Sequence, residues 1–289
     1  CCLFFYISTV IHGFISTKRA NCGAMRKPPI FCSGVKAMKR TLYQFPLSHY
    51  CEKARWMLDF KDLEYSVKNL FPAAHRLMTK LRANSDTVPM LNDGQEWIGD
   101  STEIAFYLDA KYLLRPLVPS DPASRSQVVK IENLADKAGV HVRRWIYGEI
   151  LDNPEVMNVM LDDYVYAKPF KKVLAPLMRK GIAQLYQVTP EKAAVSLEKM
   201  LEAVHQLEQI LQNNGGRYFV GDNLSLADIS VASLFAPILS VPNTPWESIQ
   251  TRTELLQKIY DDLLERPFGQ WIMRVYAEER NAKGNWHGD

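Results

Sequence analysis

The chain has 289 residues, of which 47% are hydrophobic and 23% are charged, so it is long enough for two domains with packed cores. Its formal net charge is +3, but five of the basic residues lie in the first 37 positions, which hold no acid. Residues 38–289 therefore carry 30 basic and 32 acidic side chains. This near-neutral body excludes an electrostatic footprint for nucleic acid, and the chain lacks the long apolar run that a membrane span requires.

Residues 1–37 differ in composition from the rest of the chain. They contain four of the five cysteines, and their apolar stretch precedes the basic residues, the reverse of the order in a secretory signal. We expect this leader to be disordered or non-native, with Met38 as the natural start. The body retains only Cys51, which excludes a disulfide framework and favours a reducing compartment, the cytoplasm.

From residue 40 onwards, short strands alternate with helices. A strand is predicted at 40–45, and Ser48 is a good N-cap for the helix that follows. The next elements are a strand at 64–70, a helix at 73–83, a strand at 87–91, a turn at 92–94, a return strand at 95–99 and a helix that the capping box 100–103 begins. The predicted order in this α+β half is βαβαββα.

The second half of the chain is predicted to be all-helical. A Pro-rich connection separates it from the first half, so we expect domains at 38–115 and 125–289 with a linker at 116–124. The clearest helix covers 189–211, where apolar residues recur at helical spacing. A later helix begins with Ser225 and Asp228 at capping-box spacing, and we expect Asp228 to be a buried cap.

Four motifs stand in order along this pattern. They are "SHYCEKARW" from Ser48, "TVPML" from Thr87, the pair Asp100-Ser101, and "GDNLSLADI" from Gly221. Together with the order of elements, they resemble the cytosolic glutathione S-transferase family, serine-type, over about residues 40–280. The resemblance implies a thioredoxin-like domain followed by an all-α helical bundle. It also implies detoxifying conjugation of glutathione, as co-substrate, to a small electrophile, with no metal, usually by a homodimer.

The resemblance also assigns roles to residues of the first domain. Ser48 would stabilise the glutathione thiolate, because a hydroxyl and a helix N-terminus both lower a thiol pKa. Val88, before a cis Pro89, would pair its backbone with the cysteinyl part of glutathione. Asp100 and Ser101 would hold the γ-glutamyl group at a helix N-terminus.

One part of the family pattern is missing. Some serine-type members carry Lys or Gln shortly before the cis proline, where it helps to hold the glycyl carboxylate, but this chain has Asp86 and Thr87 there. Lys53, His49 or Lys80 can substitute, and the sequence does not choose among them. We expect His49 to be a partly exposed residue of the first helical turn that contacts glutathione.

Cys51 raises an alternative reading of the same segment. "SHYC" has the form of a Cys-x-x-Cys redox motif with serine in the first position, and the second cysteine of such motifs is the more buried one. We expect Cys51 to be a packed, inert thiol. Two rival functions stay open: a glutathione-dependent thiol-disulfide oxidoreductase that uses Cys51, and a non-catalytic binding or scaffold protein.

Other polar and aromatic residues are given structural roles. Arg55 is expected to make a contact inside the first domain. Aromatic residues of the second domain are usually core, although some can line an electrophile pocket between the domains; the group in question is Trp145, Tyr147, Tyr164 and Tyr166. The sequence contains no zinc-ligand spacing, phosphate-binding loop or dinucleotide glycine fingerprint.

Overall fold

The structure, a computed structural model, describes residues 40–71, 75–161, 164, 169–280 and 286–288. These all belong to one compact unit, Met38–Asp289. The leader expected at 1–37 and the expected start at Met38 lie outside the described residues.

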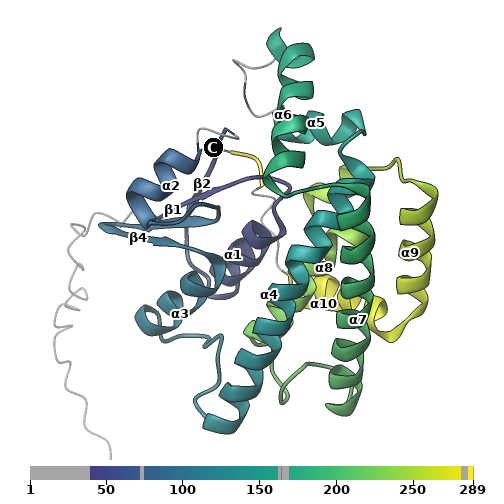
Figure 1. Cartoon of the computed structure of the whole chain (residues 1–289). Coiled ribbons are helices and arrows are strands. Elements are labelled where there is room, and N and C mark those ends of the chain that lie inside the picture. The colour runs from purple at the N-terminus through teal and green to yellow at the C-terminus, as the bar shows by residue number, and fades with distance from the viewer. Residues whose placement is uncertain (1–39, 72–74, 162–163, 165–168, 281–285, 289) are drawn as a thin grey trace, which may run out of the picture. The chain divides into compact units, whose positions relative to one another are not determined.

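The first domain is a four-stranded mixed sheet with helices, in the predicted βαβαββα order (Figure 1). The strands lie in the order β2-β1-β3-β4, with β1 parallel to β2 and antiparallel to β3. This is a thioredoxin-like fold. Its elements are β1 (Arg40–Gln44), α1 (His49–Phe60), β2 (Ser66–Asn69), α2 (His75–Ala83), β3 (Met90–Asp93), β4 (Glu96–Gly99) and α3 (Ser101–Lys111).

The β3–β4 hairpin differs from the sequence expectation in its position. The strand expected at 87–91 begins at Met90, because Pro89 has no N–H to give to a ladder. Asp93 pairs with Glu96, so the turn consists of Gly94 and Gln95 rather than residues 92–94. Gly94 has φ +73°, a conformation that favours glycine.

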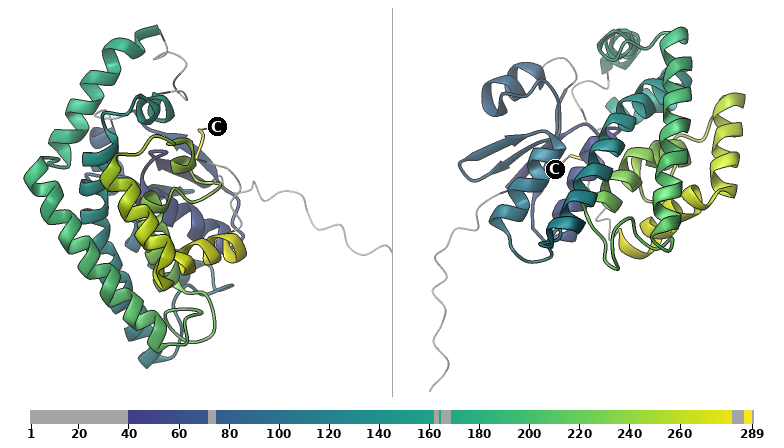
Figure 2. Two further views of the ribbon diagram at one scale, coloured as in Figure 1. Left: turned by 90° about the vertical axis from the view of Figure 1, so that its right-hand side faces the viewer. Right: turned by 60° about the horizontal axis from the view of Figure 1, so that its bottom comes forward.

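The second domain is all-helical. Its long helix α4 packs against α7 and α8, and α1 of the first domain also packs against α8 (Figure 2). The domain consists of α4 (Pro122–Ile150), α5 (Pro154–Leu161), α6 (Lys171–Leu185), α7 (Pro190–Asn213), α8 (Leu226–Leu239), the short 3₁₀ helix η2 (Pro245–Ser248), α9 (Glu254–Glu265) and α10 (Pro267–Glu279). Helix α4 begins inside the stretch that the sequence suggested as a linker.

Helix α8 is buried along its whole length, and its N-terminus is capped as predicted. The Asp228 carboxylate accepts hydrogen bonds from the backbone N–H of Ser225 at 2.9 Å and of Phe219 at 2.8 Å. The Ser225 hydroxyl donates to the same carboxylate at 2.8 Å. Burial raises the pKa of Asp228 to about 6, although these donors act in the opposite direction. Asp228 thus fixes both the helix start and the preceding loop.

The first turn of α1 is fastened to the middle of α4. Nε2 of His49 lies 3.0 Å from the carbonyl oxygen of Gly139, and the Tyr50 hydroxyl donates to the carbonyl of Asp136 at 2.9 Å. A Cβ at Gly139 would lie 2.9 Å from the Tyr50 hydroxyl oxygen and 3.3 Å from Nε2 of His49, so a side chain there would displace both groups. The two domains are therefore joined at the start of α1.

His49 is buried, with 2% of its surface exposed, so the expectation of a partly exposed residue is wrong. Helix α4 covers the ring. Burial lowers the pKa of His49 to about 3, and the positive charge of Arg143 acts in the same direction. The ring is therefore neutral and donates its Nε2 hydrogen to Gly139.

Replacing Asp228 with alanine should lower the free energy of unfolding by about 2–5 kcal/mol. The substitution leaves two buried backbone N–H groups without an acceptor, and each such loss costs about 1–3 kcal/mol. Urea denaturation measures the change. Asp222→Ala, on the exposed loop before α8, is the matched control and should change stability by less than about 0.5 kcal/mol. Equal effects of the two substitutions would contradict the capping role.

The buried ring of His49 should cost the folded protein stability as the pH falls below 6.5, the ordinary pKa of a histidine, whereas the raised pKa of Asp228 acts in the opposite direction below about pH 6. The unfolded chain takes up a proton at His49 below that value, whereas the folded chain stays neutral there down to about pH 3. Between pH 6.5 and about 5 this difference amounts to about 1–2 kcal/mol.

His49→Gln retains an N–H for Gly139 but does not titrate, so denaturation at several pH values should show a shallower acid loss than in the wild type. His205→Gln, on the exposed side of α7, should keep the wild-type slope. An unchanged slope in His49→Gln would refute the assignment.

Candidate functional site

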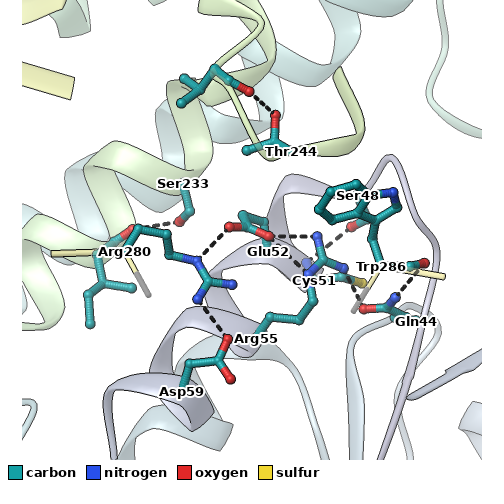
Figure 3. Close-up of polar contacts among 12 residues, drawn as sticks. Gln44, Ser48, Cys51, Glu52, Arg55, Asp59, Ser233, Thr244, Arg280 and Trp286 are labelled. Atoms are coloured by element: carbon teal, nitrogen blue, oxygen red, sulfur yellow. Dashed lines mark hydrogen bonds and ion pairs between the residues drawn. The ribbon is translucent and has the colours of Figure 1, made fainter. Parts of the chain in front are cut away.

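Ser48 lies at the N-terminus of α1, as the sequence predicts. Its backbone is extended, with φ −88° and ψ 115°, and its Oγ accepts a hydrogen bond from the Cys51 N–H at 3.3 Å (Figure 3). The side chain is half-buried, so a ligand can reach it. The hydroxyl hydrogen can be donated outwards, in the direction in which the N–H groups of the first turn also point.

Cys51 is fully buried below Ser48, as predicted for a packed thiol. Burial raises the pKa of the Cys51 thiol, and the nearby Ser48 hydroxyl offsets this only in part. The thiol therefore stays protonated at neutral pH. A buried, protonated thiol is a poor nucleophile.

A buried network of charged side chains holds α1 in place (Figure 3). Arg55 donates to one oxygen of Glu52 at 2.7 Å and Arg280 donates to the other at 2.9 Å. Arg280 also pairs with Asp59 at 2.6 Å. Burial acts to raise the pKa of Glu52, but Arg280 and Arg55 outweigh it and hold that pKa below its usual value. Arg55 thus has the structural role that the sequence suggested.

The same network reaches the last described residues of the chain (Figure 3). Arg55 donates to the side-chain oxygen of Gln44 at 2.5 Å. Gln44 and Asn69 in turn donate to the carbonyl oxygen of Trp286, at 3.2 and 2.9 Å. The C-terminal stretch therefore contacts the ends of β1 and β2. Gln44, at the end of β1, is four residues before Ser48 in the chain.

The peptide bond between Val88 and Pro89 is cis, as predicted. Val88 directly precedes β3. Among the described residues, no backbone group takes part in a hydrogen bond with the Val88 N–H or C=O. Both groups can therefore pair with an extended ligand.

The N-terminus of α3 carries an unpartnered hydroxyl. Asp100 caps this helix by accepting from the N–H groups of Thr102 and Glu103, at 2.8 and 3.3 Å. Ser101 follows it and is 1% exposed, and its Oγ has no hydrogen-bond partner in the described part of the chain. A buried hydroxyl without a partner is unusual and suits a bound polar group.

The lysines considered for the glycyl carboxylate are occupied elsewhere. Lys53 is fully buried, with its Nζ 2.6 Å from Glu132 on α4 and 3.1 Å from the Thr102 hydroxyl. Lys80 is exposed and lies 3.8 Å from Asp86. Lys53 thus adds a buried connection between the domains to those that His49 and Tyr50 make.

Sequence reasoning missed Arg143, which lies on α4 one turn after Gly139. Its guanidinium carbon is 4.2 Å from the ring centre of Tyr186 and 5.5 Å from that of Tyr50. The side chain is half-buried, and its buried Nε has no hydrogen-bond partner among the described residues. Only the spacing of Gly139, Arg143 and Tyr147 at successive turns of one helix face could have suggested it.

The aromatic residues of the second domain are core, as expected. Trp145 and Tyr147 are buried and border a hollow of about 840 Å³ between α4, α6 and α7. Tyr164 is buried and donates to the Leu70 carbonyl at 2.7 Å, another contact between the domains. Tyr166 lies outside the described residues. Within the described ranges, no helix is both long and apolar enough to span a membrane.

Comparison with known proteins identifies the family to which this fold belongs. Residues 42–116 match the family described as "Glutathione S-transferase, N-terminal domain", and residues 177–268 match "Glutathione S-transferase, C-terminal domain". Glutathione S-transferase 1 of Dianthus caryophyllus is 25% identical over 203 residues, which cover 69% of this chain and 77% of that protein. The zeta-class glutathione S-transferase of Euphorbia esula is 25% identical over 232 residues, covering 79% and 87%.

Solved structures show the same fold. The Tau class glutathione S-transferase of mango, Mangifera indica, superposes with a TM-score of 0.54 at 16% identity, covering 84% of this chain and 90% of that one. The two matched domains follow each other in the order that the fold requires, a thioredoxin-like domain and then a helical one. This chain belongs to the glutathione S-transferase family.

Proposed function

We propose that the protein conjugates glutathione to small electrophiles, with Ser48 stabilising the glutathione thiolate. The observation that carries the proposal is the position of Ser48, a half-exposed hydroxyl at the positive end of α1. There the hydroxyl and the free N–H groups of the first turn favour a bound anion. In the reaction, the thiol proton passes to solvent, the sulfur bonds to the electrophilic carbon and the leaving group departs.

Two further places would hold the rest of the tripeptide. The free backbone groups of Val88 would pair with the cysteinyl unit of glutathione, in the manner of an added strand. The unpartnered hydroxyl of Ser101 would donate to the γ-glutamyl carboxylate, and Asp100 would receive the ammonium group. Ser48, Val88 and Ser101 stand at the ends of three neighbouring elements, α1, β3 and α3.

The buried state of Cys51 disfavours the oxidoreductase alternative. Thiol-disulfide exchange needs an accessible thiolate, and burial raises the pKa of this thiol. A homodimer, a cytoplasmic location and domain limits at 38–115 and 125–289 complete the proposal, and all three rest on the family resemblance and the sequence pattern.

Ser48→Ala should lower kcat/KM for conjugation of glutathione to an aryl halide by about 10- to 100-fold, since a hydrogen bond to a charged group contributes about 1.5–3 kcal/mol. The absorbance of bound thiolate should show a higher glutathione pKa in the variant. Undiminished conjugation in Ser48→Ala would contradict the proposal.

Cys51→Ala is the matched comparison within the same helical turn, and it should conjugate like the wild type. Loss of mixed-disulfide exchange in Cys51→Ala alone would instead establish the oxidoreductase. A wild-type protein that binds no glutathione at millimolar concentration would establish the non-catalytic alternative.

Ser101→Ala should weaken glutathione binding by about 10-fold, measured by calorimetry, because it removes one hydrogen bond to a carboxylate. Its stability should hardly change, as the hydroxyl has no partner within the described residues of the free protein. Ser124→Ala, in the first turn of α4, is the control and should bind glutathione normally. Unaltered affinity in Ser101→Ala would exclude this hydroxyl from the site.

A further inference from the structure

Arg143 has no anionic partner in the part of the chain that the structure describes. Among the described residues, it forms neither an ion pair nor a hydrogen bond, and its Nε is buried and unsatisfied. Asp136, two turns earlier on α4, interacts with its charge only over a longer distance. Leaving a half-buried guanidinium unpaired costs free energy, so the arrangement is unfavourable unless a ligand completes it.

The neighbouring arginine shows the contrast. Arg144 donates its Nε to the Tyr186 carbonyl at 3.1 Å and another N–H to the Ser196 hydroxyl at 3.2 Å. Arg144 therefore ties α4 to α7 and to the end of α6. Arg143 points to a different side of α4, where its guanidinium lies against the rings of Tyr50 and Tyr186. The two rings hold the guanidinium by cation–π contacts, and no group of the described residues accepts from its N–H groups, which leaves them for an anion.

The position of Arg143 connects it with the candidate site. Tyr50 is the second residue of α1, two positions after Ser48, and it is the residue that Arg143 covers. The charges of Arg143 and of Asp100, at the start of α3, both influence the Tyr50 hydroxyl. One turn further along α4, Tyr147 packs 5.5 Å from Tyr186, ring centre to ring centre. Arg143 thus stands on the helical-domain side of the elements that carry Ser48 and Ser101.

We propose that Arg143 binds a carboxylate on the electrophile, so that the site selects electrophiles carrying an acidic group beside an aromatic or other flat body. The guanidinium would take the carboxylate in a two-point contact, and the half-buried rings of Tyr50 and Tyr186 would lie beside the body. This inference rests on the proposed function, because it assigns the second substrate of the same site.

Either of the two carboxylates of glutathione is an alternative anion for Arg143. In the proposed binding mode, the γ-glutamyl carboxylate lies at Ser101 and the cysteinyl unit lies at Val88, so the glycyl carboxylate lies beyond Val88. Arg143, in contrast, projects from the second domain. The electrophile is therefore the better match, and the experiment separates the sources.

The test compares two non-reacting conjugates that differ only in charge, S-(carboxybenzyl)glutathione and S-(carbamoylbenzyl)glutathione, together with glutathione alone. Calorimetry gives the three dissociation constants for wild type, Arg143→Met and Arg143→Lys. Methionine preserves the packing against the two rings but has no charge, and lysine retains the charge without the planar fork. Arg125→Met is the control variant, because it removes one arginine from the exposed start of α4, away from the candidate site.

We expect wild type to prefer the carboxylate conjugate over the amide by at least about 10-fold, as a charged hydrogen-bonded pair allows. Arg143→Met should abolish this preference and leave glutathione affinity within about 3-fold. Arg143→Lys should retain part of it, and Arg125→Met all of it. Thermal unfolding of the four proteins shows that they are equally folded. The kcat/KM values for a chloronitrobenzoate and the matching chloronitrobenzamide should follow the same pattern.

Three outcomes overturn the inference: a wild-type protein without preference for the carboxylate, a preference that persists in Arg143→Met, or an Arg143→Met variant that loses affinity equally for glutathione and both conjugates. The last would assign Arg143 to glutathione itself. If wild type binds no glutathione, the proposed function fails instead. The binding of chlorobenzoate against chlorobenzamide, in wild type and Arg143→Met, then decides the role of Arg143 separately.

Discussion

The position of the candidate site depends on the buried carboxylate of Glu52, which lies between Arg55 and Arg280. Helix α1 is unusual in that its charged residues are as buried as its apolar ones, with Lys53 and Arg55 fully covered. A buried charge is tolerated only when it is paired, and removing one partner of such a pair typically costs about 3–5 kcal/mol. Helix α1 therefore fits one position, set by partners outside it, and Ser48 at its start is fixed with it.

Three of those partners come from the second domain, so the contacts that position α1 also join the two domains. Glu132 and Gly139 on α4 accept from Lys53 and His49, and Arg280 follows the end of α10. All of these contacts are hydrogen bonds or ion pairs, although the core around them is apolar. Charge pairing requires specific distances and directions, whereas apolar packing tolerates small shifts. The polar contacts can thus define where α1 begins relative to α3 and β3 more narrowly than the core does.

The sequence predicted well whatever depends on neighbours along the chain. Ser48 as an N-cap and the capping role of Asp228 each arise from residues within a few positions of one another, and the cis bond before Pro89 followed from the family resemblance. The sequence failed for contacts between distant positions. His49 was expected to be partly exposed because it lies in a first helical turn, and only the crossing of α4, 90 residues later, buries it. The partner of Lys53, 79 residues away, was equally invisible.

The difference between local and long-range contacts explains why the proposed glutathione site can be recognised from the sequence and the proposed electrophile contact cannot. The proposed glutathione contacts lie at the ends of helices and strands in one small domain. Helix caps and turns require particular residues at adjacent positions, so these contacts coincide with short motifs such as Asp100-Ser101. The proposed electrophile contact, Arg143, lies inside a 29-residue helix, where an arginine is an ordinary residue. What distinguishes Arg143 is that no described residue pairs with it, whereas its neighbour Arg144 is bonded to Tyr186 and Ser196. Only the arrangement of α1, α4 and α6 in space reveals that difference. The proposed selection of the electrophile therefore depends on how these helices pack and not on a short sequence motif.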